Sequence, residues 1–396
     1  MTESSNAPNT RRLPTAVIGL GLTSLLTDVS SEMIFPLLPL LLTSLGAGAA
    51  ALGLIEGVAD AVSSLLKLAS GALADRVKRK KPLVMAGYAL ASFVRPLSGF
   101  ALHAWQVLAV RVTDRVGKGI RSAPRDAIIA QSVPHAQAGR AFGLHRAMDH
   151  AGAVLGPLVA AGLLALGLPL RSVILAAIVP GLLALLVLAF VKEPAPREGP
   201  PPSKNLASRA GVKNLPRPLR HYLGVLFLFS LGNSSDAFLL LRARELGVAV
   251  TSIPLLWTAL HVAKLTSSYA GGTLADRLPR RALIASGWCI YAGCYFALGR
   301  ATAAWQAWLL FCVYGTYYGL TEPAERAVIK ELAPVRAQGL AFGAYHFVVG
   351  ISAVPAGLLA GQLWKHFGAA AALSLGAALA LLSAVLLLLM PAPNNA

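Results

Sequence analysis

The chain has 396 residues, of which 56% are hydrophobic and only 13% are charged. This composition excludes an ordinary soluble domain, because about 25% of the residues of such domains are charged. The formal net charge of +18 does not indicate a nucleic-acid-binding protein, because the positive residues gather in short segments that anionic lipid headgroups would attract. We therefore expect an integral membrane protein in contact with the lipid bilayer and without a nucleic-acid partner.

The basic segments alternate with apolar runs, one of which, 173–191, has no charge over about one bilayer thickness. The three most basic segments lie near 76–81, 192–220 and 277–281. Because lysine and arginine concentrate in the cytoplasmic loops of membrane proteins, the pattern predicts cytoplasmic termini and a cytoplasmic central loop. We expect a multi-pass protein of the inner, or plasma, membrane.

The first apolar segment, from Pro14 into the 40s, predicts a retained membrane helix, since no cleavage site follows it at the right distance. It carries Asp28 and Glu32 one helical turn apart and on one face. An ionisable group at membrane depth costs a few kcal/mol, so both should face the bundle interior or a wet cavity. We expect them to handle substrate or protons; alternatively, they only neutralise nearby arginines.

The second apolar segment, 51–74, adds Asp60 to a stripe that also holds Glu56 and Lys67. It ends in the basic turn 71–81. The next segment, 82–102, shows no feature that points to function.

The segment that begins near residue 105 is unusual in its charge, because an apolar start is followed by seven charged residues: Arg111, Asp114, Arg115, Lys118, Arg121, Arg125 and Asp126. At about 1.5 Å per residue, Arg111 would lie on the order of 10 Å below the outer surface. Its guanidinium keeps its proton there and needs an anionic partner, for which Asp114, Asp28, Glu32 and Asp149 are candidates. We expect Arg121 and Arg125 to mark the cytoplasmic end of this helix.

The segment 139–165 combines ionisable side chains with small residues. His145 and Asp149 lie one turn apart, and a histidine beside a carboxylate is suited to carrying a proton, or is simply a satisfied hydrogen-bond partner. Small residues predict close packing against a neighbouring helix, and a proline predicts a bend; these residues are Gly143, Gly152, Gly156 and Pro157. The spacing offers too few ligands for a metal, and we expect no metal or other cofactor.

The segment 192–219 is a proline-rich basic linker that cannot form a packed core. It divides the chain into two parts, 1–191 and 220–396. The second part has fewer charges, among them Asp236, His261 and Glu325, and more aromatic residues. Its aromatics serve a substrate site or, equally, packing and anchoring at the membrane interface.

The two parts repeat each other with an offset close to 200 residues. Asp75 corresponds to Asp276, Pro134 to Pro334, and the run 141–143 to 341–343. A repeat of this length is far longer than a solenoid unit and indicates two homologous bundles.

Three motifs carry a resemblance to the major facilitator superfamily. The turns at 71–81 and 272–281 resemble its loop signature, with Lys78 and Pro279 where the signature has glycine. The run 111–119 is similar to its helix 4 signature, whose arginine corresponds to Arg111 or Arg115. The glycines of 143–157 resemble its helix 5 antiporter signature, although Ala160 replaces a glycine.

The resemblance implies an all-α integral membrane fold with twelve transmembrane helices in two pseudo-symmetric six-helix bundles, working as a monomer. The bundles would rock around a central site. It also implies a cytoplasmic gate in which Asp75 faces the chain near Gln338 and Gly339, Arg79 or Lys80 reaches Asp126, and Asp276 and Arg280 act with Glu325. The gate residues would be Gly71, Asp75, Arg76, Arg79, Asp126, Asp276, Arg277, Arg280 and Glu325.

The function that these features predict is proton-coupled secondary transport of a small organic solute, by antiport and in the direction of export. One alternative is a proton symporter that imports a nutrient or siderophore; another is a membrane scaffold or sensor, against which the cost of the buried charges argues. The chain has no phosphate-binding loop or nucleophile elbow, so we expect that the protein is not an enzyme. The expected proton-coupling and cavity residues are Asp28, Glu32, Asp60, Arg111, Asp114, His145, Asp149, Asp236 and His261.

Overall fold

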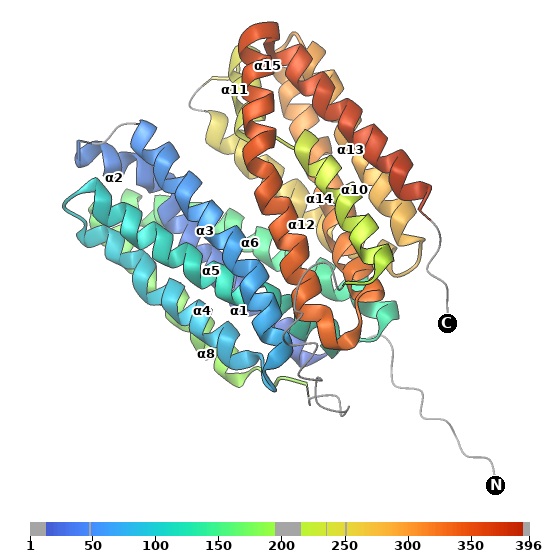
Figure 1. Cartoon of the computed structure of the whole chain (residues 1–396). Coiled ribbons are helices and arrows are strands. Elements are labelled where there is room, and N and C mark those ends of the chain that lie inside the picture. Colours follow the sequence, from blue (N-terminus) through green and yellow to red (C-terminus); the bar gives the residue numbers. More distant parts are fainter. Residues whose placement is uncertain (1–12, 47–48, 195–214, 235, 250–251, 391–396) are drawn as a thin grey trace.

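The computed structural model describes residues 13–46, 49–194, 215–234, 236–249 and 252–390. Within these ranges every secondary-structure element is a helix (Figure 1). The predicted all-α fold is confirmed. Most of the predicted linker, 195–214, lies outside the described residues, so its boundaries stay a prediction.

The first half of the described chain crosses the membrane in six helical segments. Some crossings are broken into two or three elements, which run on from one another. The elements are α1 (Thr15–Ile34), η1 (Phe35–Leu37), α2 (Leu38–Ser44), α3 (Ala49–Arg76), α4 (Lys81–Val94), η2 (Arg95–Phe100), α5 (Ala104–Ser132), η3 (His135–Gln137), α6 (Ala138–Ala165), α7 (Leu170–Ala176) and α8 (Ile178–Phe190).

The second half of the described chain also supplies six crossings. Its elements are α10 (Arg217–Gly232), α11 (Asp236–Glu245), α12 (Ile253–Ala275), α13 (Arg280–Arg300), α14 (Ala304–Leu332), η6 (Val335–Ala337) and α15 (Gln338–Leu388). α15 contains two crossings, because Gly368 has a φ of 82° and breaks the helical backbone between them. A positive φ of this kind is open to glycine without steric cost.

The helices α5 and α14 show the duplication most clearly. Each has 29 residues, and they begin 200 positions apart, at Ala104 and Ala304. In each, a glutamine side chain turns back to accept from the backbone N–H before the helix: Gln106 from His103 and Gln306 from Ala303, both at 3.0 Å. The same start chemistry therefore recurs at the same place in both halves.

Six stretches of the described chain are long and apolar enough to be recognised as membrane spans from length and hydropathy alone. They include α6 and α13, but α5 is not among them. The charges between Arg111 and Asp126 make α5 polar along one face, and twelve of the residues from Gly117 to Ala130 are nevertheless buried among other helices. The charged side chains of α5 are therefore accommodated inside the bundle and not against lipid.

The two halves lie closest together on the side of the molecule that carries the loops 77–80, 133–137, 276–279 and 333–337 (Figure 1). We call this the basic side, because Lys78 to Lys81 and Arg277 to Arg281 lie there. α3 packs on α15, and α6 packs on α12 and α14. The first two contacts are backbone-close: a Cβ on Gly71 would collide with the carbonyl oxygen of Gly339, and one on Gly139 with that of Gly272.

Candidate functional site

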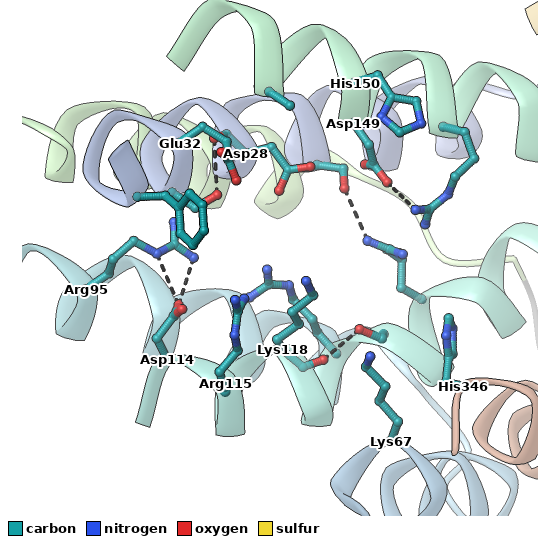
Figure 2. Close-up of a pocket in the computed structure, with 18 of the residues that line it drawn as sticks. Asp28, Glu32, Lys67, Arg95, Asp114, Arg115, Lys118, Asp149, His150 and His346 are labelled. Carbon is teal, nitrogen blue, oxygen red and sulfur yellow. Dashed lines mark hydrogen bonds and ion pairs between the residues drawn. The ribbon is translucent and has the colours of Figure 1, made fainter. Parts of the chain in front are cut away.

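A cavity of about 440 Å³ lies between the two halves. The first half supplies most of its wall from α1, α3, η2, α5 and α6, and the second half supplies Trp257, His261, Arg326 and His346. Figure 2 shows carboxylates of α1 on one side and the charged face of α5 on the other. The predicted residues that it brings together are Asp28, Glu32, Arg111, Asp114, Asp149 and His261.

A buried ion pair joins three helices at one end of this cavity. Arg95 in η2 is 2% exposed, and its Nη2 lies 2.8 Å from Oδ1 of Asp114. Its Nη1 also donates to the backbone oxygen of Thr27 in α1, at 3.0 Å. Arg111 approaches the same carboxylate at 3.6 Å. Asp114 is thus the partner that Arg111 was expected to need.

Arg95 was missed by the sequence analysis, which saw nothing functional in 82–102. A signal was present, because an arginine in an otherwise apolar segment at membrane depth must find an anion. The structure places it inside the bundle.

Asp28 and Glu32 differ from the other carboxylates of the cavity wall. Both line the cavity, and among the described residues neither takes part in an ion pair. The charged groups that act on Asp28 come from three elements: Asp149 in α6, Lys118 and Arg121 in α5, and Glu32 in its own helix. These two carboxylates therefore face a space in which a proton or a ligand can reach them.

An ion-pair chain crosses from the first half to the second beside the cavity. Nη1 of Arg146 lies 2.9 Å from Oδ2 of Asp149, and its Nε lies 3.5 Å from Oε2 of Glu322 in α14. His145 lies behind Asp149, fully buried and 3.7 Å from it. His145 does not line the cavity, whereas Asp149 does.

Asp126 is fully buried and forms a second crossing between the halves. Its carboxylate lies 3.1 Å from Nη2 of Arg125, 2.8 Å from Nε2 of His346 and 3.8 Å from Nε of Arg326. The expectation that Arg79 or Lys80 reaches Asp126 is therefore wrong. α5 continues to Ser132, so Asp126 lies inside the bundle, well before the loop.

The expected position of Arg121 and Arg125 at the cytoplasmic end of the helix is wrong for the same reason. Both line the cavity and are 5% and 6% exposed. Arg125 is fully used, with Asp126, Ser24 and Tyr88 as partners. The guanidinium of Arg121 stacks on the Tyr88 ring at 4.4 Å, and its Nη1 is buried without a hydrogen-bond partner among the described residues.

Two matching latches join the halves on the basic side. Asp75, at the end of α3, accepts from the backbone N–H of Gly339 and Leu340, both at 2.7 Å. Asp276, after α12, accepts from Gly139 at 2.7 Å and from Arg140 at 2.9 Å. These N–H groups lie in the first turn of α15 and of α6, where no intrahelical acceptor exists.

Each latch is a helix cap supplied by the opposite half. Neither α6 nor α15 has a side-chain cap of its own, and a carboxylate is the favoured partner of a helix N-terminus. Burial raises the pKa of the Asp276 carboxyl, against the lowering effect of the two N–H groups. The predicted approach of Asp75 to Gly339 is thus present, and Asp276 repeats it.

The remaining expected gate contacts are different. Arg280 pairs with Glu331 at 2.7 Å, not with Glu325, which accepts from the hydroxyl of Tyr345 at 2.8 Å inside the second half. The loop after α3 is held by Glu193, which accepts from the backbone of Lys80 at 2.7 Å. The side chains of Arg76, Arg79 and Arg277 are exposed.

The glycines of α6 have two different partners. Gly152 and Gly156 lie against α1, where a Cβ on Gly156 would come within 2.8 Å of the carbonyl oxygen of Val29. Gly143 lies against α12 of the opposite half, within 2.6 Å of the carbonyl oxygen of Ser268 by the same measure. Pro157 lies inside α6. Close packing of this helix is therefore required both within its own half and across the interface.

Asp236 lies apart from the cavity wall, in an aromatic cluster of the second half. Its Oδ1 accepts from the hydroxyl groups of Tyr314 at 2.7 Å and Tyr318 at 3.2 Å. Nζ of Lys264 lies 3.4 Å from Oδ2 and 3.7 Å from the centre of the Tyr318 ring. This acid is held by its neighbours and does not line the cavity.

Two further residues expected at the cavity are His261 and Asp60. His261 lies at the cavity, with its ring 5.7 Å from that of His150 across the interface. The side chain of Asp60 lies outside the described residues. No group of three or more His, Cys, Asp or Glu side chains within the described ranges is placed to hold a metal ion.

The cavity wall has an excess of positive charge. Among its described residues, nine are lysine or arginine and four are aspartate or glutamate. Asp126 and Glu322 lie just behind the wall and neutralise part of the excess through Arg125, Arg146 and Arg326. The described part of the cavity stays cationic after these pairs are counted.

A helical membrane protein of two six-helix halves, closed on one side by paired latches around a charged cavity, is a transporter, not an enzyme. The chain belongs to the Major Facilitator Superfamily, whose family profile matches residues 20–242 and again residues 222–396. The double match confirms the resemblance seen in the sequence and the predicted fold class.

The relatives of this chain include a protein named as a transporter and a protein named for multidrug resistance. It is 36% identical to an uncharacterised MFS-type transporter of Methanocaldococcus jannaschii, over 97% of this chain and 96% of the relative. It is 28% identical to the multidrug resistance protein MdtG of Enterobacter lignolyticus, over 96% and 93%.

Solved structures share the fold at low identity. The human organic anion transporter MFSD10 superposes with a TM-score of 0.77 at 18% identity, over 96% of this chain and all of that one. The proton:xylose symporter XylE also gives 0.77, at 16% identity and over 95% of each chain.

Proposed function

We propose that this protein is a proton-coupled secondary transporter that exports a small organic solute across the plasma membrane by alternating access. The observation that carries the proposal is the pair Asp28 and Glu32, two carboxylates that face the cavity between the halves without an ion pair among the described residues. Ionisable groups at membrane depth are costly and mark ion or proton pathways. A carboxylate open to a cavity can take up a proton from one side and release it to the other.

The latches supply the conformational part of the proposal. We assign the basic side to the cytoplasm by the positive-inside rule, which puts both termini there. The structure is then closed towards the cytoplasm by Asp75 and Asp276. Opening requires both helix caps to be released, so the closed state is held by interactions that the open state lacks. We expect a monomer to be sufficient, because the cavity lies within one chain.

Export as the direction is supported by the name of MdtG, a multidrug resistance protein, and by the glycine pattern of α6. A second candidate, proton symport with an anionic solute, is favoured by the cationic wall of the cavity. Protonation of Asp28 or Glu32 would make that wall more positive and would strengthen anion binding. The proton and the anion would then be transported in the same direction.

The test uses proteoliposomes that contain a pH-sensitive dye and carry an imposed proton gradient, to which pooled compounds are added outside. Alkalinisation of the lumen on addition of a substrate supports proton antiport. Acidification would show symport and replace the first candidate by the second. No response across broad pools, with protein shown to be folded, would contradict proton coupling.

A further inference from the structure

We infer that the cavity binds a small organic anion with two or more negative charges, such as a phosphate ester or a di- or tricarboxylate, and that Arg121 is its anchor. The inference rests on the proposed transport function and names a substrate class for it, the class that the second candidate, proton symport, would carry. It starts from the excess of cations over carboxylates in the described part of the cavity wall.

The cations lie where a ligand could use several of them. Arg111, Arg115, Lys118 and Arg121 follow one another at intervals of three or four residues along α5, which places them on one face of the helix. All four line the cavity, and Figure 2 shows Arg115 and Lys118 directed into it. A molecule with two separated negative groups would meet more than one of these side chains.

Three cations of the cavity wall already form ion pairs with carboxylates of the protein. Arg95 is bound to Asp114, Arg125 to Asp126, and Arg146 to Asp149, at 2.8, 3.1 and 2.9 Å. These pairs fix the shape of the cavity. The count of charges excludes Glu56 and Asp60 of α3, whose side chains lie outside the described residues.

Arg121 is the exception among the buried arginines. It is 5% exposed, it lines the cavity, and its guanidinium rests on the face of Tyr88. Its Nη1 has no hydrogen-bond partner within the described chain. A buried guanidinium that cannot lose its proton and keeps a donor unused is suited to a ligand carboxylate or phosphate, which it can bind through two parallel N–H groups.

The contrast with Arg125, one turn later on the same helix, supports this reading. Arg125 donates to Asp126, to the Ser24 hydroxyl and to the Tyr88 hydroxyl. Both arginines are buried to a similar degree, but among the described residues only Arg125 has a carboxylate of the protein as its partner. The inferred ligand would supply the carboxylate or phosphate that Arg121 lacks.

The test measures thermal unfolding of the purified full-length protein in detergent, at constant ionic strength, with citrate, glycerol 3-phosphate or inorganic phosphate as probes. Glycerol and choline serve as neutral and cationic comparisons. A ligand that binds only the folded state stabilises it by RT ln(1 + [L]/Kd), so the dependence of Tm on ligand concentration gives an apparent Kd. We expect citrate and glycerol 3-phosphate to raise Tm, and glycerol and choline to have no effect.

The variant Arg121→Gln should weaken the binding of these anions by roughly 10- to 100-fold, as expected for the loss of a charged hydrogen bond. Arg300→Gln is the matched control, because Arg300 also stacks on an aromatic ring, that of Phe296 at 3.8 Å, but lies outside the cavity. It should leave the apparent Kd unchanged. If Arg121→Gln does not fold, Lys118→Gln takes its place, with weaker anion binding as the expected result.

Three results would overturn the inference. Anion binding that persists in the folded Arg121→Gln or Lys118→Gln protein would place the anions on the basic loops. Stabilisation by choline and not by the anions would show that the protein binds cations. No stabilisation by any probe would exclude recognition by charge. Since no proton gradient is present, anion binding in this assay together with a flat pH response in proteoliposomes would contradict proton coupling alone.

Discussion

The two halves of this transporter share a scaffold and differ in how they use buried charge. In the first half, charged side chains of α1, α5 and α6 line a cavity, and their pairs reach across helices, as Arg95 does to Asp114. In the second half, Asp236 and Lys264 are enclosed by tyrosines. We therefore propose that the first half carries the chemistry of transport, while the second half supplies the opposite wall of the cavity.

The latches, in contrast, have the same structure in both halves. Asp75 caps α15 and Asp276 caps α6, in each case through two backbone N–H groups. The duplicated protein has therefore kept the device that joins the halves and has changed the side chains between them.

The largest expected effect is on the buried pair of the first half. Replacement of Arg95 by methionine leaves Asp114 buried beside the more distant Arg111, and should lower the free energy of unfolding by about 3–5 kcal/mol. Thermal unfolding in detergent measures the loss. The double variant Arg95→Met with Asp114→Leu removes both charges but also takes the Asp114 carboxylate from Arg111, so it should regain only part of the loss. A single variant as stable as the wild type would show that the pair does not hold α1, η2 and α5 together.

The matching pair of the second half should be less sensitive. Lys264→Met removes the cation beside Asp236, but the hydroxyl groups of Tyr314 and Tyr318 continue to donate to the carboxylate. We expect a loss of about 2 kcal/mol in the same measurement. A loss as large as that of Arg95→Met would remove the proposed difference between the halves.

Substitutions in the two latches should lower the free energy of unfolding by equal amounts, which are the smallest of these predicted effects. In Asp75→Asn and in Asp276→Asn the amide accepts one N–H where the carboxylate accepts two, which should cost about 1 kcal/mol at each site. Because the two sites have no common partner, the two losses should add. Membrane insertion should be unaffected, whereas transport should slow several-fold. Unchanged transport by a well-expressed Asp75→Asn protein would count against the latch.

The features that the sequence predicted are those that short segments determine. The offset of 200 residues and the helix starts follow from motifs of a few residues that occur twice. The approach of Asp75 to Gly339 was implied by the family resemblance that these motifs carry. The stripe of charge on α5 was also visible, because helical spacing fixes which side chains share a face.

Partners across helices were harder to predict, because they depend on how far each helix extends and how it is rotated. The end of α5 was placed several residues too early, so Asp126 was assigned to the loop arginines and Arg121 to the membrane surface. Arg280 was paired with Glu325, but Glu331 lies nearer to the end of α14 and reaches it. Arg95 was overlooked because its acid, Asp114, is 19 residues away on another helix.

The central claim is that protons are coupled through the first half. The most direct measurement is the pH change inside proteoliposomes on addition of citrate or glycerol 3-phosphate, compared between Asp28→Asn with Glu32→Gln and the matched variant Asp236→Asn. The account predicts that the double variant in the first half loses the pH change while still binding the anion, and that Asp236→Asn keeps it. A pH change that survives in the double variant and disappears in Asp236→Asn would contradict the account.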